Sequence, residues 1–532
     1  MSRRSEVRSQ QSAGGSGKLQ TEKGGLRTGV SKTLPKGWIE IDLDKIVIYG
    51  KGKKPKTLTP NNDIGLVPYV NIKGFEKGII DEYADVKSSK LINKTEILVV
   101  WDGARFGLTG MGMEGAAGST LMVLTPVLNK PEYIYNFINR YYSYINSKPK
   151  GTGTPHVNPD IFWKLQFPIA PLTEQKRIVA KLDKIMPRID AVKERLDKVP
   201  SIIKRFRQSV LTAAVTGKLT EKWRAEHPDV ESARVLLKHI IEERKQTKKS
   251  LKQQYSFKVT DEIDERFIAL EVPNTWRKTN VDSVSIFIVD CPHSTPKWTA
   301  SGKLCLRTTN FLPNQLDLSE VRFVSDETFS RRILRLKPQK GDVLYSREGG
   351  ILGIACKIDT DEEICLGQRM MMFRISNYTI NSYFTYCLNS PPIIQHVNNL
   401  IGGSAAPHIN IRDIKKYPFP LPPFEEQKEI VRQVDKLFAL ADRLESHYQK
   451  AKARVDKLSQ SVLAKAFRGE LVITEAELAE KEGRDFESSE KLLERILEEK
   501  AKLVGSGQRT DVGMRTARGS KAKEKETGGK KQ

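Results

Sequence analysis

A loop near the start of the chain gathers four lysines among glycines. Residues 49–57 read Tyr-Gly-Lys-Gly-Lys-Lys-Pro-Lys-Thr, and the lysines are Lys51, Lys53, Lys54 and Lys56. Mobile ammonium groups beside free backbone N–H donors suit contact with the phosphates of a nucleic acid. The alternative interpretation of such a charge run is a solvated surface loop. Because the whole chain is strongly basic, we take phosphate contact as the hypothesis to test.

Three further loops offer side chains that could read base edges or hold phosphates. Residues 290–298 place polar side chains between two prolines and beside a tryptophan, which suits base reading, although an ordinary turn stiffened by proline would have the same sequence. Residues 101–107 and 346–353 each follow a predicted strand. They combine glycines, which permit close approach, with an arginine that can fork onto phosphate or guanine. The candidate DNA contacts outside the lysine loop are Arg105, His293, Thr295, Lys297, Arg307 and Arg347.

Motifs that imitate catalytic sites fail on their spacing. Asp160 and the Glu-Gln-Lys run at Glu174 imitate the carboxylates and lysine of a nuclease, but a later repeat of this segment has Arg412 in place of Asp160. The Glu-Gln-Lys run is instead typical of an N-terminal helix cap. Residues 389–392 interrupt the Asn-Pro-Pro-aromatic motif of amino-methyltransferases, and residues 217–218 lack the flanks of a phosphate-binding loop. No catalytic residue and no metal site is predicted.

The composition excludes several classes of protein. The chain has 532 residues and a net charge of +24, which indicates a polyanionic partner. Its five cysteines lack CxxC spacing, which argues against a disulfide framework and a zinc site. With no apolar run long enough for a membrane span and no secretory signal, a soluble cytoplasmic protein without membrane contact is expected. Residues 1–33 and 505–532 are predicted to be disordered basic tails.

An apolar stripe with coiled-coil spacing occurs twice at a constant offset. Apolar residues spaced alternately by three and four begin at Leu182 and again at Val434. The segments that enter the two stripes match as well, since residues 174–176 and 426–428 both read Glu-Gln-Lys. A register kept without gaps over this length indicates a duplicated unit. The predicted seam residues are Leu182, Ile189, Leu196, Ile203, Val210, Val434, Leu444, Val455 and Val462.

The stripes and the loop-rich regions between them predict the fold class. We expect an α+β protein in which two α+β domains are separated by two long, antiparallel, coiled-coil-like helical regions, related by an internal pseudo-two-fold repeat. Pro187 and Pro200 interrupt the first stripe, so the first helix is expected to kink or restart there. The predicted boundaries are 34–172 and 272–423 for the α+β domains, and 173–255 and 424–504 for the helical regions.

The order of these regions and the entry segments of the helices carry a resemblance to a known family. Residues 171–179 read Pro-Leu-Thr-Glu-Gln-Lys-Arg-Ile-Val, and residues 423–431 read Pro-Phe-Glu-Glu-Gln-Lys-Glu-Ile-Val. With a variable domain before each helix, residues 34–504 resemble the specificity subunit of type I restriction-modification systems. The resemblance implies that each variable domain is a target recognition domain reading one half of a split site on double-stranded DNA.

The same resemblance implies the partners. The helical regions would bind two adenine methyltransferase (M) subunits, and motor-nuclease (R) subunits would join for cleavage. Those partners would bind S-adenosylmethionine, ATP and magnesium, whereas this chain would bind no cofactor and would not be catalytic alone. The alternative is a two-headed, sequence-specific DNA-binding regulator, which would bind DNA tightly without methyltransferase subunits.

Overall fold

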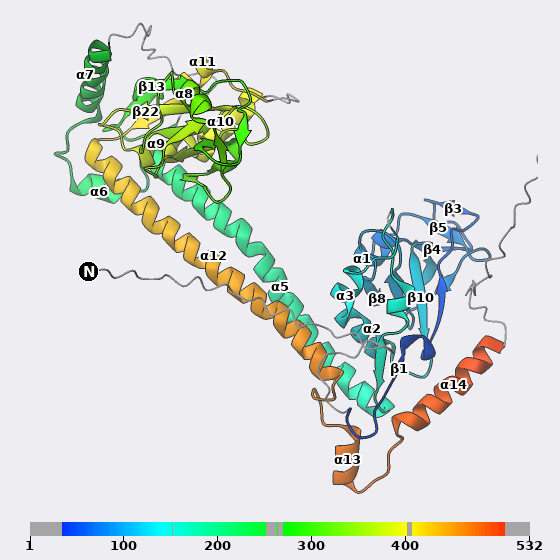
Figure 1. The fold of residues 1–532 in the computed structure, drawn as a ribbon. Helices are drawn as coiled ribbons and strands as arrows, with labels where there is room; N and C mark the ends of the chain where they lie inside the picture. The colour runs from blue at the N-terminus through cyan, green and yellow to red at the C-terminus, as the bar shows by residue number, and fades with distance from the viewer. Residues whose placement is uncertain (1–33, 152, 252–262, 264–269, 402–406, 506–532) are drawn as a thin grey trace, which may run out of the picture. The chain divides into compact units, whose positions relative to one another are not determined.

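The chain forms two compact units, each built from separate parts of the sequence. The computed structural model describes residues 34–151, 153–251, 263, 270–401 and 407–505. Of these, unit 1 contains residues 34–194 and 452–505, and unit 2 contains residues 195–451. Each unit therefore combines one α+β region with the first part of one long helix and the last part of the other (Figure 1). The predicted basic tails lie outside the described residues, apart from Gly505.

The α+β region of unit 1 is organised around two sheets. The first has the strand order β2-β10-β7-β8, the second has the order β3-β5-β4-β9-β6, and β1 and β11 form a separate antiparallel pair. The strands are β1 (Ile39–Asp42), β2 (Val47–Lys51), β3 (Leu58–Thr59), β4 (Leu66–Val70), β5 (Tyr83–Asp85), β6 (Leu91–Ile92), β7 (Ile97–Val100), β8 (Thr109–Met111), β9 (Gly115–Ala117), β10 (Leu121–Pro126) and β11 (Gln166–Ile169). The helices are η1 (Leu43–Lys45), α1 (Ile72–Lys77), α2 (Pro131–Arg140), α3 (Tyr142–Asn146) and α4 (Pro159–Phe162).

The α+β region of unit 2 repeats the first of these sheets. Its order is β13-β22-β19-β20, while β14-β18-β15-β21 form a second sheet, β16-β17 a hairpin and β12-β23 a separate pair. The strands are β12 (Arg277–Asn280), β13 (Ser285–Asp290), β14 (Trp298–Thr299), β15 (Lys303–Leu306), β16 (Phe311–Leu312), β17 (Gln315–Leu316), β18 (Arg322–Val324), β19 (Val343–Ser346), β20 (Ala355–Lys357), β21 (Ile364–Leu366), β22 (Met370–Ile375) and β23 (Pro418–Leu421). The helices are η2 (Thr308–Asn310), α8 (Asp326–Arg332), α9 (Asn381–Leu388), α10 (Pro391–Ile401) and α11 (Ile411–Lys415).

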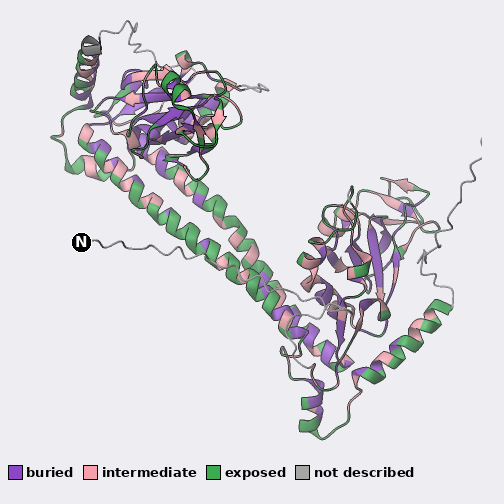
Figure 2. Cartoon of the chain, in the orientation of Figure 1, coloured by how far each residue is buried: buried purple, intermediate pink, exposed green. Residues whose placement is uncertain are grey.

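The central strand β7 shows why these sheets form. All four of its residues are fully buried, and Ile97 and Val99 face one hydrophobic core while Leu98 and Val100 face another. Successive side chains of a strand point to opposite faces, so a continuous apolar run is what a strand buried on both faces requires. Figure 2 shows this burial concentrated in the strands, whereas much of the long helices is exposed.

Two long helices, α5 (Leu172–Val215) and α12 (Phe424–Ala466), are each uninterrupted. The expected restart of the first helix at Pro187 or Pro200 is therefore wrong. Both prolines lie on the exposed side of α5. The carbonyl groups that lose their intrahelical hydrogen bonds can therefore bind water, and the helix continues.

The helices pair in antiparallel fashion inside each unit, as predicted. In unit 1, Leu182 and Ile189 of α5 share a core with Val462 of α12. In unit 2, Arg207 of α5 bonds to Asp442 of α12, with a distance of 2.6 Å between Arg Nη2 and Asp Oδ1. The start of each helix thus packs against the end of the other.

The predicted seam residues are buried or half-buried except Leu444, which is 47% exposed. In α12 the buried positions recur every seventh residue, at Val434, Ala441, Tyr448 and Val462, so one column of side chains fills the seam. In the second heptad column, Leu437 is half-buried against the core, whereas Leu444 and Leu458 are exposed. Of the other predicted residues, Leu182, Ile189, Ile203 and Val210 are buried, and Leu196 and Val455 are half-buried.

Shorter helices follow each long one and return the chain to an α+β region. They are α6 (Glu221–Glu226) and α7 (Ala233–Leu251) after α5, and α13 (Glu475–Glu482) and α14 (Ser489–Gly505) after α12. None of the described helices is long and apolar enough to cross a membrane.

Candidate nucleic-acid interface

Backbone hydrogen bonds at the end of the repeated sheet define equivalent positions in the two units. In unit 1 the N–H of Trp101 donates to the carbonyl of Thr120 at 2.8 Å, and in unit 2 the N–H of Arg347 donates to the carbonyl of Arg369 at 3.1 Å. Strand pairing places Lys51 opposite Met122 in one unit and Asp290 opposite Met371 in the other. Position for position, Trp101 thus corresponds to Arg347, Thr120 to Arg369 and Lys51 to Asp290.

The loop that follows each central strand is held by the same bonds. The N–H of Gly103 donates to the carbonyl of Pro155 at 2.9 Å, and the N–H of Gly349 donates to the carbonyl of Pro407 at 3.0 Å. The two prolines begin the Pro-His segments that occur in both halves of the sequence. These bonds run between backbone groups, so they keep the loops in place whatever side chains the loops carry.

In unit 1 the lysine loop lies across the edge of the repeated sheet. Its four lysines are exposed, and Lys51 Nζ lies 2.7 Å from Asp102 Oδ2. Gly52 is required here because a Cβ at this position would lie 2.1 Å from the carbonyl oxygen of Gly118. The loop is thus pressed against the protein backbone while its ammonium groups face outward.

The far end of the lysine loop is fastened by an aspartate. Asp85 Oδ2 accepts from the Thr57 N–H at 3.0 Å, and the Ser88 hydroxyl accepts from the Lys56 N–H at 2.7 Å. Hydrogen bonds, first from the Ser88 side chain and then from backbone N–H groups, lower the pKa of Asp85 to about 2. The fixing carboxylate is therefore ionised at neutral pH.

Arg105, predicted as a DNA contact, remains available at the surface. Its side chain is 59% exposed, and one guanidinium nitrogen lies 2.6 Å from Glu76 Oε2. An exposed ion pair of this kind exchanges readily with water or another anion, because it contributes little free energy.

Arg347 has a structural role instead of the predicted DNA contact. Its side chain is 7% exposed, and its Nε and Nη2 atoms donate to the two oxygens of Asp290 at 3.0 and 2.9 Å. Nη1 donates to the carbonyl of Ile409 at 3.2 Å, and Glu348 Oε1 lies 2.7 Å from Nη2. With its guanidinium enclosed by these partners, Arg347 fixes the loop. Sequence alone did not reveal this, because the equivalent residue of unit 1 is a tryptophan.

The loop at residues 290–298 presents the predicted DNA-contact residues His293, Thr295 and Lys297 at the surface. Gln368 fixes it, donating to the His293 carbonyl at 2.5 Å and accepting from the Thr295 hydroxyl at 3.3 Å. The His293 ring is 61% exposed, and its Nε2 lies 3.0 Å from Asp290 Oδ2. The ring is thereby oriented without being covered.

Arg307 lies between strand β15 of the second sheet of unit 2 and η2. Its side chain is partly exposed, and Nη2 donates to the Glu320 carbonyl at 3.5 Å. This weak contact leaves most of the donor capacity of the guanidinium unused. The DNA-contact role of Arg307, like those of the other exposed candidates, stays a prediction.

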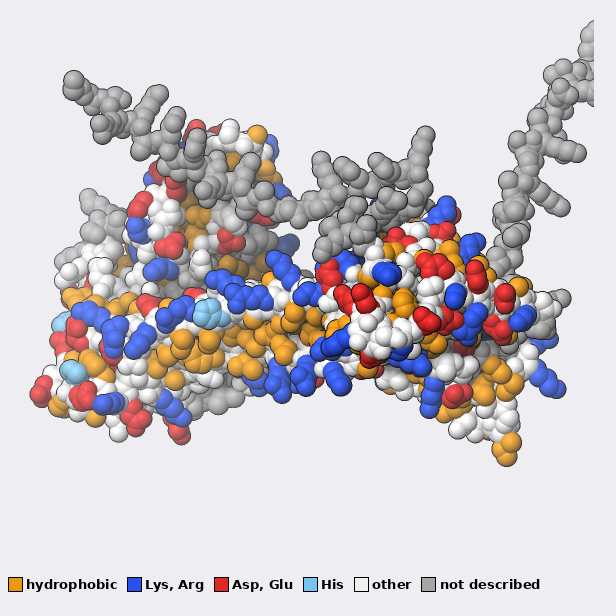
Figure 3. Space-filling view, turned by 90° about the horizontal axis from the view of Figure 1, so that it is seen from below, with side chains coloured by type: hydrophobic (Ala, Val, Ile, Leu, Met, Phe, Trp, Pro, Cys, Tyr) orange, Lys and Arg blue, Asp and Glu red, His pale blue; other side chains and the backbone are white. Residues whose placement is uncertain are grey.

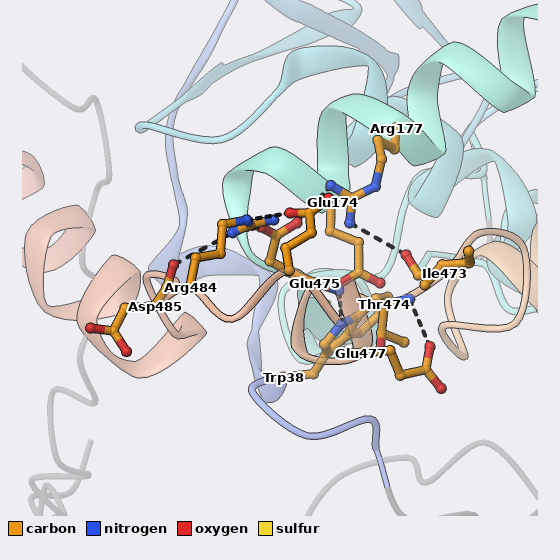
Figure 4. Close-up of polar contacts among 10 residues, drawn as sticks. Trp38, Glu174, Arg177, Ile473, Thr474, Glu475, Glu477, Arg484 and Asp485 are labelled. Atoms are coloured by element: carbon orange, nitrogen blue, oxygen red, sulfur yellow. Dashed lines mark hydrogen bonds and ion pairs between the residues drawn. The ribbon is translucent and has the colours of Figure 1, made fainter. Parts of the chain in front are cut away.

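A buried carboxylate joins the start of α5 to the segment before β1 and to the start of α13 (Figure 4). Glu174 is fully buried, and its Oε2 accepts from Trp38 Nε1 at 3.1 Å and from the Glu475 N–H at 2.8 Å. Among the described residues, its Oε1 has no hydrogen-bond partner. Burial raises the pKa of Glu174 above its ordinary value, although the two donors oppose this. The expected N-terminal cap is thus wrong, because the carboxylate bonds to other segments.

The adjacent carboxylate of Glu475 is held by two arginines. Arg177 Nη1 lies 2.6 Å from Glu475 Oε2, and Arg484 Nη1 lies 2.8 Å from Oε1. Burial favours the neutral acid, but these cations outweigh it and hold the pKa of Glu475 below its ordinary value. Figure 4 shows Arg177 and Arg484 reaching the carboxylate from different segments.

Unit 2 makes the equivalent junction with a full set of partners. Glu426 is also fully buried, and its Oε2 accepts from Trp276 Nε1 at 2.8 Å. Its Oε1 accepts from the Thr220 hydroxyl at 2.7 Å and from Arg224 Nη2 at 2.8 Å. Here the carboxylate meets a cation and a hydroxyl, whereas Glu174 meets only neutral N–H donors.

The described residues contain no group of three or more His, Cys, Asp or Glu side chains that could hold a metal ion. All five cysteines are buried free thiols. The features that remain are two exposed loop systems and two buried junctions, which suit binding and scaffolding.

Comparisons with known proteins agree with this arrangement. The chain is 28% identical over 465 residues to the specificity subunit of the type I restriction enzyme EcoKI of Escherichia coli (strain K12), covering 82% of this chain and 90% of that protein. It is 25% identical to the MjaVIII specificity subunit of Methanocaldococcus jannaschii, covering 80% of this chain and 92% of the relative.

A solved structure shares the fold. It was determined to show the structural basis of complex assembly and conformational transition of the type I R-M system, and it matches with a TM-score of 0.54 at 18% identity. The match covers 83% of this chain and all of the other.

The model of one protein family matches residues 35–201 and 315–452, together more than half of the chain. These segments contain most of both repeated sheets and the starts of both long helices. The chain therefore belongs to the family of the type I restriction modification DNA specificity domain.

Proposed function

We propose that this chain is the DNA sequence-recognition subunit of a type I restriction-modification complex, and that each unit reads one half of a bipartite target. The observation that carries the proposal is the repeated sheet with its shared backbone bonds and its different loop side chains. A common frame with divergent exposed groups suits two readers of different base sequences, since base edges specify and phosphates position.

The long helices are the proposed docking surface for two methyltransferase subunits. Val192, Leu440, Leu444 and Leu458 are apolar and at least 40% exposed on these helices. Figure 3 shows hydrophobic side chains along the helices with Lys and Arg side chains beside them. Apolar groups rimmed by charge are typical of a protein interface.

The remaining components follow from the same proposal. Motor-nuclease subunits would join for cleavage, and the partner subunits would bind S-adenosylmethionine, ATP and magnesium. This chain would be non-catalytic by itself and would work in the cytoplasm on cellular DNA.

The test is to map methylated adenines on a randomised duplex library. We expect the chain assembled with its methyltransferase subunits to yield one bipartite motif, and the chain alone to yield no methylation and no cleavage with any of the cofactors. Methyl transfer by the isolated chain would contradict the non-catalytic role. Tight, sequence-specific binding by the isolated chain, without any motif in the assembled complex, would favour the two-headed regulator.

A further inference from the structure

We propose that Arg369 is the guanine-reading residue of unit 2 and that the sequence-predicted Arg347 only supports it. The inference rests on the proposed function and deepens it, because it assigns one base contact to one side chain.

Arg369 is an exposed arginine whose guanidinium is unengaged. Among the described residues, no hydrogen bond, ion pair or aromatic ring contacts its side-chain nitrogens. Its neighbour Arg347, by contrast, is enclosed by Asp290, Glu348 and the Ile409 carbonyl. Of the two arginines at this loop, only Arg369 has all five of its N–H donors available to a ligand.

The backbone of Arg369 is held in a conformation that side chains disfavour. Its φ is +66°, in the left-handed region that non-glycine residues seldom adopt. The Arg347 N–H bonds to its carbonyl, and the next residue, Met370, pairs with Ser346 in the sheet. A glycine would satisfy this backbone without strain, so the arginine side chain itself must account for the residue chosen here.

The space beside Arg369 is kept open by Gly349. A Cβ on Gly349 would lie 3.2 Å from Arg369 Nη1 and 3.3 Å from its Cδ, so a side chain there would press against the arginine. Gly349 itself has a φ of +85°. The Arg369 side chain therefore lies beside the loop that contains Glu348 and Gly349.

The neighbouring groups fit a guanine·cytosine base pair. A guanidinium can donate in bidentate fashion to the O6 and N7 atoms of guanine, and a carboxylate can accept from the exocyclic amine of cytosine. Glu348 is 26% exposed, and its Oε2 has no partner among the described residues. Arg369 and Glu348 thus supply both complementary halves of such a contact. The equivalent residues of unit 1, Thr120 and Asp102, lack the guanidinium, so the second half-site should not share this contact.

The deciding variant is Arg369→Gly, which removes the side chain and also relieves the backbone strain. We expect its unfolding midpoint to equal or exceed that of the wild type. In the assembled complex, discrimination in favour of guanine at one position of one half-site should fall by roughly 5- to 150-fold, the range for one bidentate pair. Arg369→Gln should also lose the preference, because its amide matches adenine instead. The matched control is Arg331→Ala, an exposed arginine on α8 of the same unit, which should leave the motif unchanged.

The outcomes separate this inference from the proposed function. If the wild-type complex methylates without sequence preference, the proposed function fails and the Arg369 assignment fails with it. If the wild type gives a bipartite motif that Arg369→Gly leaves intact, only the assignment is overturned. Uniform weakening across all sequences would likewise overturn it, since Arg369 would then be a phosphate anchor. A lower unfolding midpoint for Arg369→Gly would show a structural role and would also count against it.

Discussion

The two units share a backbone frame and differ in the charges placed upon it. At the end of the first strand of the repeated sheet, unit 1 has Lys51 paired with Asp102, whereas unit 2 has Asp290 paired with Arg347. The cation lies on the strand in unit 1 and on the loop in unit 2, yet the surrounding backbone bonds are the same. A scaffold held by backbone groups leaves its loops free to change their side chains, which is what two readers of different sequences need.

The buried junctions of Glu174 and Glu426 show a different kind of divergence. Both units keep the glutamate, but its hydrogen-bond partners differ. Glu426 has a cation and two further donors, while Glu174 shares its one bonded oxygen between two N–H groups and leaves the other unbonded. Buried carboxylates stabilise a fold only when their lone pairs are satisfied. The same glutamate should therefore contribute very differently to the two units.

The largest difference should come from charges placed in the helix seam. Ile203 is 6% exposed in unit 2, and its repeat equivalent Val455 in unit 1 is half-buried. Ile203→Asp should cost about 4 kcal/mol of unfolding free energy, and Val455→Asp about half of that, because a buried unpaired charge is expensive. Urea unfolding, with hydrogen exchange to assign the effect to a unit, measures both. The control Ile202→Asp, at a 52% exposed site, should change the unfolding free energy little. Equal losses of stability for all three variants would show that Ile203 and Val455 do not lie in a buried seam.

Substituting the junction glutamates tests the second comparison directly. Glu426→Gln should destabilise unit 2 by about 3 kcal/mol, since it leaves Arg224 without its counter-charge in a buried site. Glu174→Gln should be neutral or stabilising, because one amide oxygen can accept from both Trp38 and Glu475 while the amide N–H₂ replaces the unbonded oxygen. Thermal unfolding of each variant gives the sign. A loss of comparable size in both would mean that the junctions are equivalent after all.

The lysine loop should make unit 1 the more salt-sensitive reader. Joint replacement of Lys51, Lys53, Lys54 and Lys56 by Ala should lower the slope of log binding constant against log salt by up to about 0.9 for each phosphate that is no longer neutralised. The methylated motif should stay the same. The control replaces Lys491 and Lys502 of α14 by Ala, which matches the charge removed by replacing two of the four loop lysines. An unchanged slope would show that the loop does not contact DNA phosphates. An altered motif would show that the loop contacts bases.

The smallest effect concerns pH. The pKa of Glu174 is raised above its ordinary value of 4.5, mainly by burial, so its neutral form is favoured in the folded state. Its contribution to stability is present below pH 4.5 and is lost as the pH rises through the raised pKa. Relative to Glu174→Gln, the wild type should therefore lose stability as the pH rises above 4.5 and through the raised pKa, by less than about 1.4 kcal/mol per pH unit. Parallel curves for the two proteins would exclude titration of this group.

The sequence predicted most of the architecture because duplication and periodicity are local patterns. The offset repeat located both long helices and the segments that enter them, and the heptad spacing located the buried seam residues except Leu444. The prediction failed for Leu444 because burial in its heptad column is confined to part of the helix: Leu437 is half-buried, but Leu444 and Leu458 are exposed. The exposed loops were found by composition. The burial of Arg347 could not be predicted from composition, because its partner Asp290 is distant in the chain and only strand pairing brings the two together.

The residues that the sequence did not reveal depend on the folded backbone. Arg369 carries no motif, and its positive φ, immediately before strand β22, is a property of the folded backbone. Glu174 stood out only as a helix-entry residue, since its partner Glu475 lies on the other side of unit 2 in the chain order. A sequence signal for Glu174 did exist, because a tryptophan precedes the glutamate in each copy of the repeat: Trp38 before Glu174, and Trp276 before Glu426.

Because unit 1 is made of two separate segments, it can complete its folding only late in translation. Unit 2 is one continuous stretch that is complete once residue 451 has been synthesised, whereas in unit 1 residues 452–505 must meet residues 34–194, which are made before unit 2. The Ser489 N–H bonds to the Gly37 carbonyl, and the Lys500 ammonium bonds to the Asp44 carbonyl. At roughly 5 to 20 residues per second, the last segment arrives some seconds after unit 2 is whole. Through that interval the α+β region of unit 1 lacks the contacts that Glu475, Ser489 and Lys500 make with it.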